Sequence, residues 1–380
     1  MKKIIIAPDK FKGSLTSLEF CHAINKGIKS ISPETHIDYC PLSDGGDGTI
    51  EVLKFHLGGN LTTTQVNDPL GRPINACYLL SKKRRIAYIE MAAASGISLL
   101  KPNELNPMKA STFGTGQLIM DAIKQGAQHI IIGIGGSATN DAGLGMARAL
   151  GYRFYDCHNN ELPGCGEDLN KVHHIDQSNV LSSISKIKFE VLCDVDNPFY
   201  GPRGAAYVYA RQKGATPSDI ERLNDGLIHF NKLIREYQHI DLQEISGSGA
   251  AGGMGGGCIF FLNASLNSGI ESIKEIVQLN EKIRDVDWVI TGEGLLDEQT
   301  LHGKVISGIL KEVTNQKVAV FCGQNNLNKQ VLNKMPIHHL SVMMDKAQSL
   351  EDSIKNARLC LEEAAKQFAS LYLSIPQKRP

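Results

Sequence analysis

The same order of elements occurs at both ends of this 380-residue chain: a short apolar strand, a polar loop and an amphipathic helix. The first unit has a strand at 4–7 and a helix that begins at Thr16-Ser-Leu-Glu19, a capping-box sequence. A second unit follows, with a strand at 35–40 and a helix at 49–57. Successive units of this kind place their strands in parallel, so this order predicts a parallel sheet with helices on its faces.

The same order returns after residue 284, with strands at 286–291, 317–322 and 337–343 and a closing helix at 353–372. Between the two ends, residues 61–91 read as an antiparallel meander of three strands. We therefore predict two α/β domains. Residues 1–64 and 285–380 form the parallel-sheet domain, residues 65–284 form an inserted mixed-sheet domain, and the active site lies in a cleft between them.

A glycine-rich turn at 133–145 joins a buried strand at 129–134 to a helix at 144–150. Its glycines permit close approach of a ligand, and the helix start offers unpaired N–H groups to an anion. Either this turn cradles a phosphate or carboxylate, or it is a tight turn with an ordinary cap. The cap candidates are Thr139, Asn140 and Asp141.

Charge and cysteine usage exclude several classes of partner and location. Lys+Arg and Asp+Glu both number 40, so nothing in the net charge favours nucleic acid or an anionic membrane. The nine cysteines show no metal-type spacing, which is typical of a reducing compartment. The apolar runs are too short for a signal peptide or a membrane span, so we expect a cytoplasmic protein that acts on a small molecule.

Two glycine-containing segments partly match known nucleotide-binding motifs, but neither match is complete. Gly303-Lys304 is followed by Val305 and lacks the upstream glycine of a Walker A loop. The Gly-x-Gly-x-x-Gly match at 247–252 follows no apolar strand, so it is a weak dinucleotide signal. We expect the surrounding stretch, 247–257, to be neither helix nor strand, because glycine is unfavourable in both.

Acidic and basic residues recur in the loops at the carboxyl ends of the expected strands, often beside glycine. Phosphoryl transfer needs this inventory: carboxylates for magnesium, lysines and N–H groups for phosphate, and a carboxylate near the attacking hydroxyl. Each residue alone would more often be a cap or a solvated charge. The loop residues are Asp9, Lys10, Lys12, Asp44, Asp47, Glu90, Asn140, Asp141, Asp194, Asp196, Asn197, Glu293, Asp297 and Lys304.

Five motifs in the same order resemble those of the bacterial glycerate kinase family, and the likeness runs from residue 3 to about 370. They are Ala-Pro-Asp-Lys-Phe-Lys-Gly-Ser-Leu-Thr (7–16), Ser-Asp-Gly-Gly-Asp-Gly-Thr (43–49), Gly-Gly-Ser-Ala-Thr-Asn-Asp-Ala-Gly (135–143), Cys-Asp-Val-Asp-Asn-Pro (193–198) and Ile-Thr-Gly-Glu-Gly (290–294).

The resemblance implies transfer of the ATP γ-phosphate to a hydroxyl of D-glycerate with Mg²⁺, with the 2-hydroxyl favoured over the 3-hydroxyl. It also implies a flavodoxin/Rossmann-like domain built from both chain ends and an inserted domain. We expect a monomer or homodimer. Three positions depart from the family pattern: Lys10 stands for Ser, Asp47 for Glu, and Leu295 for a basic residue. Lys10 could supply the cation that Leu295 removes.

Site roles follow from the resemblance as hypotheses. Asp194 takes the hydroxyl proton, with Asp44 and Asp141 as alternatives, and Lys12, placed in the same catalytic set, binds phosphate or the glycerate carboxylate. Glu293 and Asp297 hold Mg²⁺. Substrate or phosphate contacts are expected from Asp9, Lys10, Gly45, Gly46, Asp47, Gly135, Gly136, Ser137, Thr139, Asn140 and Asn197.

Two other functions suit the same residues. A metal-dependent phosphatase would release phosphate without an acceptor alcohol. A flavodoxin-like binding protein would hold a nucleotide tightly without turnover.

Overall fold

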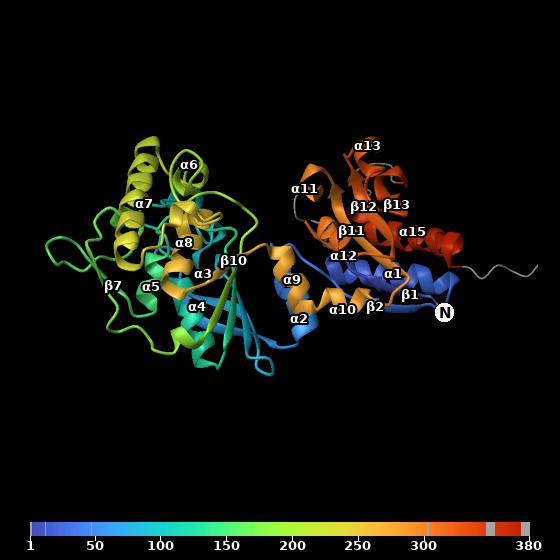
Figure 1. Cartoon of the computed structure of the whole chain (residues 1–380), viewed down its shortest axis with the longest axis horizontal. Helices are drawn as coiled ribbons and strands as arrows, with labels where there is room; N and C mark the ends of the chain where they lie inside the picture. Colours follow the sequence, from blue (N-terminus) through green and yellow to red (C-terminus); the bar gives the residue numbers. More distant parts are fainter. Residues whose placement is uncertain (1, 12, 47, 302–303, 347–353, 374–380) are drawn as a thin grey trace, which may run out of the picture. The chain divides into compact units, whose positions relative to one another are not determined.

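The computed structural model describes residues 2–11, 13–46, 48–301, 304–346 and 354–373. The chain divides into two compact units, unit 1 with Met1–His56 and Ser268–Pro380, and unit 2 with Leu57–Asn267. Both ends of the chain, blue and red in Figure 1, thus belong to one unit. The inserted domain was predicted to span residues 65–284. Both predicted boundaries lie later in the chain than the boundaries of unit 2. The first difference arises because β3 (Asn60–Asn67) pairs along its whole length with unit 2's β4.

The second difference concerns α9 (Gly269–Val277) and α10 (Leu279–Ile283), which belong to unit 1. Lys274 of α9 forms a 2.6 Å ion pair with Glu312 of α12 (Val305–Glu312), and Ile270 lies against Gly308. These contacts pack α9 onto the parallel-sheet unit.

Within the described residues, the sheet of unit 1 has five strands, all parallel, in the order β13-β12-β11-β1-β2. Its strands are β1 (Lys3–Ile6), β2 (His36–Tyr39), β11 (Trp288–Leu296), β12 (Lys317–Asn325) and β13 (His339–Val342). The remaining helices of this unit are α1 (Ser17–Ile31), α2 (Thr49–Leu57), α11 (Glu298–Leu301), α13 (Lys329–Leu332) and α15 (Ala357–Tyr372), with a 3-10 turn η7 (Met343–Lys346). Helix α1 begins with the expected capping box, Thr16 and Glu19.

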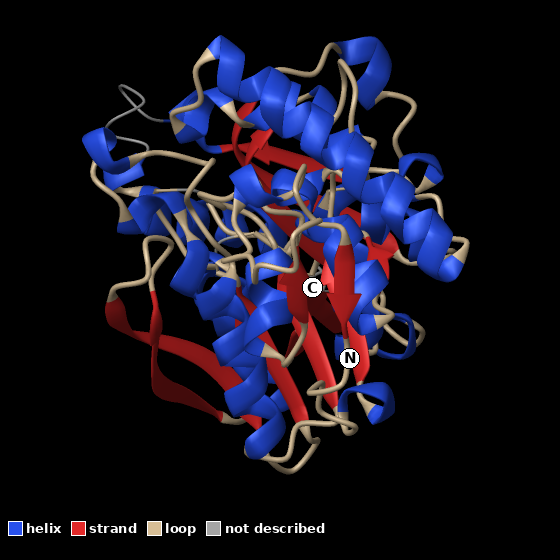
Figure 2. Ribbon diagram, turned by 90° about the vertical axis from the view of Figure 1, so that its left-hand side faces the viewer, coloured by secondary structure: helices blue, strands red, loops and turns tan. Residues whose placement is uncertain are grey.

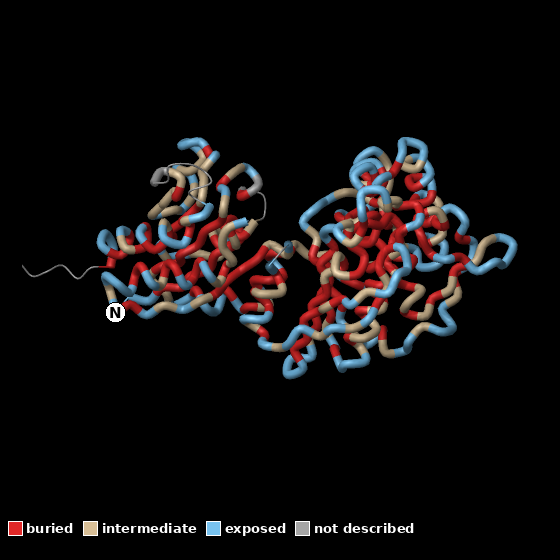
Figure 3. The backbone as a smooth tube through the Cα atoms, turned by 180° about the vertical axis from the view of Figure 1, so that it is seen from behind, coloured by how far each residue is buried: buried red, intermediate tan, exposed pale blue. Residues whose placement is uncertain are grey.

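Alternate residues of β12 face the two helical layers of unit 1. Phe321 packs in one core with Phe20 of α1 and Phe368 of α15. Val318 and Val320 pack in a second core with Ile306 of α12. Burial on both faces is typical of a parallel sheet, and buried segments, red in Figure 3, run through the interior of the unit.

Within the described residues, the main sheet of unit 2 has six strands in the order β10-β9-β6-β5-β4-β3. Strands β5, β6, β9 and β10 are parallel, and β3, β4 and β5 form the expected antiparallel meander. The further strands are β4 (Pro73–Ser81), β5 (Ile86–Glu90), β6 (His129–Gly133), β9 (Lys188–Leu192) and β10 (Ser265–Asn267). An additional hairpin, β7 (Arg153–Tyr155) and β8 (His174–Asp176), was not expected.

Helices pack against this mixed sheet (Figure 2) and share one apolar core with it. They are α3 (Ala92–Ser95), α4 (Phe113–Lys124), α5 (Leu144–Ala149), α6 (Ala205–Tyr209), α7 (Pro217–Gln238) and α8 (Ala250–Leu262), with short 3-10 turns between them. The predicted fold class, a parallel sheet from both chain ends and an inserted mixed sheet, is confirmed. No helix in the described part of the chain is long and apolar enough to cross a membrane.

The glycine-rich stretch 247–257 corrects one prediction, because most of it lies within α8. Three successive left-handed residues, 251–253, kink the start of this helix. The glycines allow close packing: a Cβ on Gly257 would lie 2.2 Å from the carbonyl oxygen of Ala142, and one on Gly256 would lie 2.6 Å from Phe199. Tertiary packing therefore outweighs the low helix propensity of glycine here.

Strand β11 is a second correction. It continues to Leu296, so 292–296, expected as a loop, extends the sheet. Glu293 pairs in register with Cys322 of β12. Glu293 thus stands on a rigid strand.

Candidate active site

The pocket of unit 1 lies where the order of the sheet reverses. From β1 the chain proceeds to β2 on one side, whereas β11, β12 and β13 follow one another on the other side. The N–H of Asp9, just after β1, donates to the carbonyl oxygen of Gly292 on β11 at 2.9 Å. The carboxyl ends of β1 and β11 are therefore neighbours at a topological switch point, where open α/β sheets bind their ligands.

A pocket of about 590 Å³ opens at this switch point. Among the described residues, its charged lining consists of Asp9, Lys10, Asp44, Glu293, Asp297 and Lys304. The apolar part of its wall consists of Phe11, Leu295, Met343, Ile354 and Ala357. A polar and an apolar wall in one cavity suit a ligand with an anionic and an aromatic end.

Two carboxyl groups of the pocket are strongly perturbed. Asp9 is 7% exposed and Glu293 is 5% exposed. Burial, reinforced by the negative charge of Asp44, raises the pKa of Asp9 to about 7. Burial also raises the pKa of Glu293 to about 7, against the opposing effects of Thr300 and Lys304. The pocket thus holds carboxyl groups whose ionised forms are disfavoured by burial, and a bound cation would stabilise those ionised forms.

The 43–49 loop contributes one wall of the pocket. Asp44 and Gly46 line it, and the N–H of Gly46 donates to Asp44 Oδ1 at 3.1 Å. Gly45 has a φ of 91°, which a glycine readily adopts. The loop therefore presents Asp44 from a tight turn. Two other predicted site residues, Lys12 and Asp47, lie outside the described residues.

In unit 2, the turn after β6 is held from within by Asp141. Asp141 is 1% exposed, and its carboxylate accepts hydrogen bonds from the N–H and hydroxyl of Thr112 and from the N–H groups of Gly143 and Gly145. The N-cap position of α5 is occupied by Gly143, with a φ of 76°. The prediction of Thr139, Asn140 or Asp141 as the N-cap is therefore wrong. Asp141 accepts from the N–H groups of Gly143 and Gly145, but it lies before the N-cap position.

A buried lysine supports the same turn. Lys213, at the end of the 3-10 helix η5 (Arg211–Lys213), is 2% exposed. Its Nζ donates to Ser137 Oγ at 2.8 Å and to the carbonyl oxygen of Thr139 at 2.7 Å. Burial lowers the pKa of Lys213 to about 7, although Asp141 opposes the shift. Thr139 and Asn140 are buried as well, whereas Gly135 and Gly136 are exposed at the tip.

The loop after β9 carries the predicted base. Asp194 is exposed there, and Asp196 pairs with Arg203 at 3.2 Å. The side chain of Asn197 is anchored: its Nδ2 donates to the carbonyl oxygen of Arg203 at 2.8 Å, and its Oδ1 accepts from Tyr209 at 2.5 Å. Asn197 therefore shapes this loop.

The glycine-rich start of α8 brings the loops after β6 and β9 together. The N–H of Gly249 donates to the carbonyl oxygen of Asn197 at 3.0 Å. A Cβ on Gly252 would lie 2.1 Å from the carbonyl oxygen of Thr139. Two of the predicted loops of unit 2 are thus neighbours at the carboxyl ends of parallel strands.

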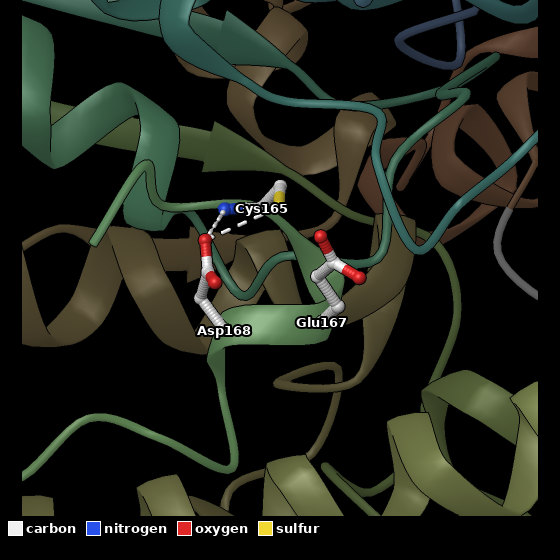
Figure 4. A group of neighbouring side chains, drawn as sticks. All are labelled: Cys165, Glu167 and Asp168. Carbon is white, nitrogen blue, oxygen red and sulfur yellow. Dashed lines mark hydrogen bonds between the residues drawn. The ribbon is translucent and has the colours of Figure 1, made fainter. Parts of the chain in front are cut away.

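A compact group of metal-type ligands elsewhere in unit 2 has a structural explanation. Cys165, Glu167 and Asp168, drawn in Figure 4, have ligand atoms within 4.8 Å of one another. Asp168 already accepts hydrogen bonds from the N–H groups of Gly164 and Cys165 and from Lys171. Burial raises the pKa of the Cys165 thiol, which disfavours a metal-binding thiolate.

Sequence reasoning missed three features of these sites. Lys213 lies in a polar stretch, Ala210-Arg-Gln-Lys-Gly214, with no motif of its own. Thr300 and the apolar pocket residue Met343 also carried no signal, because their roles depend on tertiary contacts. The one available hint for Thr300 was its spacing of three residues from Asp297, which is typical of a capping box.

The chain is similar to known proteins along almost its whole length. The sequence model of the glycerate kinase family matches residues 4–373. A glycerate kinase of Halalkalibacterium halodurans is 40% identical over 371 residues, 97% of this chain and 98% of the relative. A glycerate 2-kinase of Escherichia coli is 42% identical over 307 residues, 81% of each chain. A crystal structure of a protein described as glycerate kinase 2 from Salmonella typhimurium superposes with a TM-score of 0.88 at 40% identity, covering 97% of this chain and 98% of that one.

The fold, the pocket and these relatives define a kinase, a phosphotransferase that acts on an alcohol group. The chain belongs to the glycerate kinase family.

Proposed function

We propose that this protein phosphorylates D-glycerate with ATP and Mg²⁺, and that it acts on the 2-hydroxyl. The observation that carries the proposal is the switch-point pocket, where carboxylates and lysines of three family-like motifs meet. The relative from Escherichia coli, named a glycerate 2-kinase, supports the choice of hydroxyl. Among the described residues no cysteine forms a disulfide, which supports a reducing compartment such as the cytoplasm.

The size and lining of the pocket support its assignment to the nucleotide. A volume of about 590 Å³ lies within the range of cofactor sites and far exceeds the volume of a three-carbon acid. Phe11, Met343 and Ile354 provide an apolar surface for a base. Lys10 and Lys304 provide cations for phosphate oxygens.

The carboxylates of the pocket fit a magnesium ion. Mg²⁺ prefers oxygen ligands and is usually held by one or two carboxylates, with water and phosphate oxygens completing its coordination. We assign Glu293 and Asp297 as its ligands, with Asp9 and Asp44 contributing negative charge nearby. When bound, the ion neutralises charge on the phosphates during transfer.

The chain's own residues then orient the substrates and accept the proton. The glycerate hydroxyl oxygen attacks the γ-phosphorus, the bond to the β-phosphate oxygen breaks, and ADP leaves. We retain Asp194 as the base, with Asp44 as the alternative. Asp141 suits this role less, because four donors already hold its carboxylate. We assign the glycerate carboxylate to the exposed tip of the 135–143 turn.

The test is ADP release from MgATP with and without D-glycerate. The proposal expects ADP formation that depends on D-glycerate and disappears in Glu293→Gln. Phosphate release without any acceptor would instead favour a phosphatase. Tight nucleotide binding with no turnover across hydroxy acids would favour a binding protein.

A further inference from the structure

We propose that Thr300 is a positioning residue that fixes Glu293 and Asp297 for a divalent cation. This inference rests on the proposed function, which assigns these two carboxylates to Mg²⁺. Thr300 lies in the short helix α11 and is fully buried. Its side chain joins the strand β11 to the loop that follows it.

Three hydrogen bonds connect Thr300 to Glu293 and Asp297, and two of them reach a carboxylate oxygen. Its hydroxyl donates to Glu293 Oε1 at 2.5 Å. The hydroxyl oxygen of Thr300, Oγ1, accepts from the N–H of Asp297 at 3.1 Å, and the N–H of Thr300 donates to Asp297 Oδ1 at 3.3 Å. One residue therefore fixes an oxygen of each carboxylate.

The direction of the hydroxyl bond is determined by its partners. A threonine hydroxyl has one proton, and the N–H of Asp297 can only donate. The proton of Thr300 therefore points at Glu293 Oε1. A donor on this oxygen sets the rotation of the carboxylate, as outer hydrogen bonds do for other metal ligands.

Helix capping explains only part of this arrangement. The reciprocal bonds between Asp297 and Thr300 are those of a capping box at the start of α11. The third bond, to Glu293 on β11, has no part in a helix cap. It is also the shortest of the three, as expected for a hydroxyl bonded to a carboxylate.

The experiment measures binding of Mn²⁺, as a spectroscopic substitute for Mg²⁺, to the full chain. Free Mn²⁺ is followed by electron paramagnetic resonance in the wild type, Thr300→Val, Thr300→Ser and Glu293→Gln. Removal of a hydrogen bond that orients a ligand typically weakens metal binding about 10–100-fold. We expect a loss of this size in Thr300→Val and near-normal affinity in Thr300→Ser, which keeps the hydroxyl.

Thr291 offers a matched control on the same strand. It is fully buried, and its hydroxyl has no hydrogen-bond partner among the described residues. Thr291→Val removes a buried hydroxyl without affecting the carboxylate pair, so we expect unchanged Mn²⁺ affinity. Thermal melting checks that each variant is folded. Should Thr300→Val not fold, Thr300→Ala is the second variant without a hydroxyl, and the same loss is required of it.

The outcomes separate this inference from the proposed function. If Glu293→Gln loses Mn²⁺ binding but folded Thr300→Val binds like the wild type, the positioning role is refuted and the cation site stands. A folded Thr300→Ser that binds as poorly as Thr300→Val also refutes the role of the hydroxyl. If Glu293→Gln binds Mn²⁺ like the wild type, the assigned cation site is wrong, and the role of Thr300 with it.

Discussion

Replacement of Lys213 by methionine should change how stability depends on pH. Lys213 has a pKa of about 7 in the folded protein, against an ordinary value of 10.5. Above pH 10.5 the group is neutral in both states, so its burial has no electrostatic cost. As the pH falls towards 7, the unfolded chain binds the proton and the folded chain does not. The cost to folding therefore grows and is complete below pH 7.

The size of the effect follows from this shift. One pKa unit corresponds to about 1.4 kcal/mol, so linkage lowers the free energy of unfolding by about 4 kcal/mol at pH 7 and about 2 kcal/mol at pH 9. Lys213→Met removes this dependence. It also leaves Ser137 and the carbonyl oxygen of Thr139 without their donor, but that cost does not vary with pH. The wild type should therefore gain about 2 kcal/mol relative to Lys213→Met between pH 7 and pH 9.

Urea unfolding followed by circular dichroism at the two pH values measures this difference. Lys232, exposed on α7, provides the control, since Lys232→Met removes a charge that water solvates in both states. A wild type and a Lys213→Met variant whose stabilities change in parallel between pH 7 and pH 9 would refute a lowered pKa at Lys213.

Three further predictions test separate parts of the account. Asp194→Asn should lower turnover by orders of magnitude and leave the melting temperature unchanged, because the side chain is exposed; near-normal turnover would remove it from the base role. Lys10→Met should raise the KM for MgATP about tenfold with a smaller change in kcat, because one phosphate contact is lost; an unchanged KM would place the phosphates elsewhere. Gly257→Ala should destabilise the protein by about 1–3 kcal/mol, since its Cβ would lie 2.2 Å from the carbonyl oxygen of Ala142; a melting temperature equal to that of the wild type would show that α8 moves freely.

Elements with strong local signals could be predicted from the sequence. The capping box of Thr16 and Glu19 located α1, and the range 49–57 matches α2. The alternation of strand, loop and helix at both ends predicted the parallel sheet. Because loops at carboxyl ends of parallel strands gather at one edge, Asp9, Lys10 and Asp44 could be grouped before their contacts were seen.

Features that depend on contacts between distant segments could not be predicted. The helix α8 contradicts the low propensity of its glycines, because Gly257 must pass close to the backbone of Ala142. Nothing in the sequence around Lys213 distinguishes it from an exposed lysine. Its burial and its hydrogen bond to Ser137 depend on tertiary structure. The commitment of Asp141 to four internal donors is likewise invisible in the motif that contains it.

The measurement that tests the central claim most directly is conversion of the product by enolase. The purified protein is incubated with MgATP and D-glycerate, and enolase is added with no phosphoglycerate mutase present. The account predicts immediate formation of phosphoenolpyruvate, because phosphorylation of the 2-hydroxyl gives 2-phosphoglycerate. ADP formed without phosphoenolpyruvate, with signal restored by the mutase, would show phosphorylation of the 3-hydroxyl. The absence of ADP would contradict the assignment of D-glycerate as the substrate.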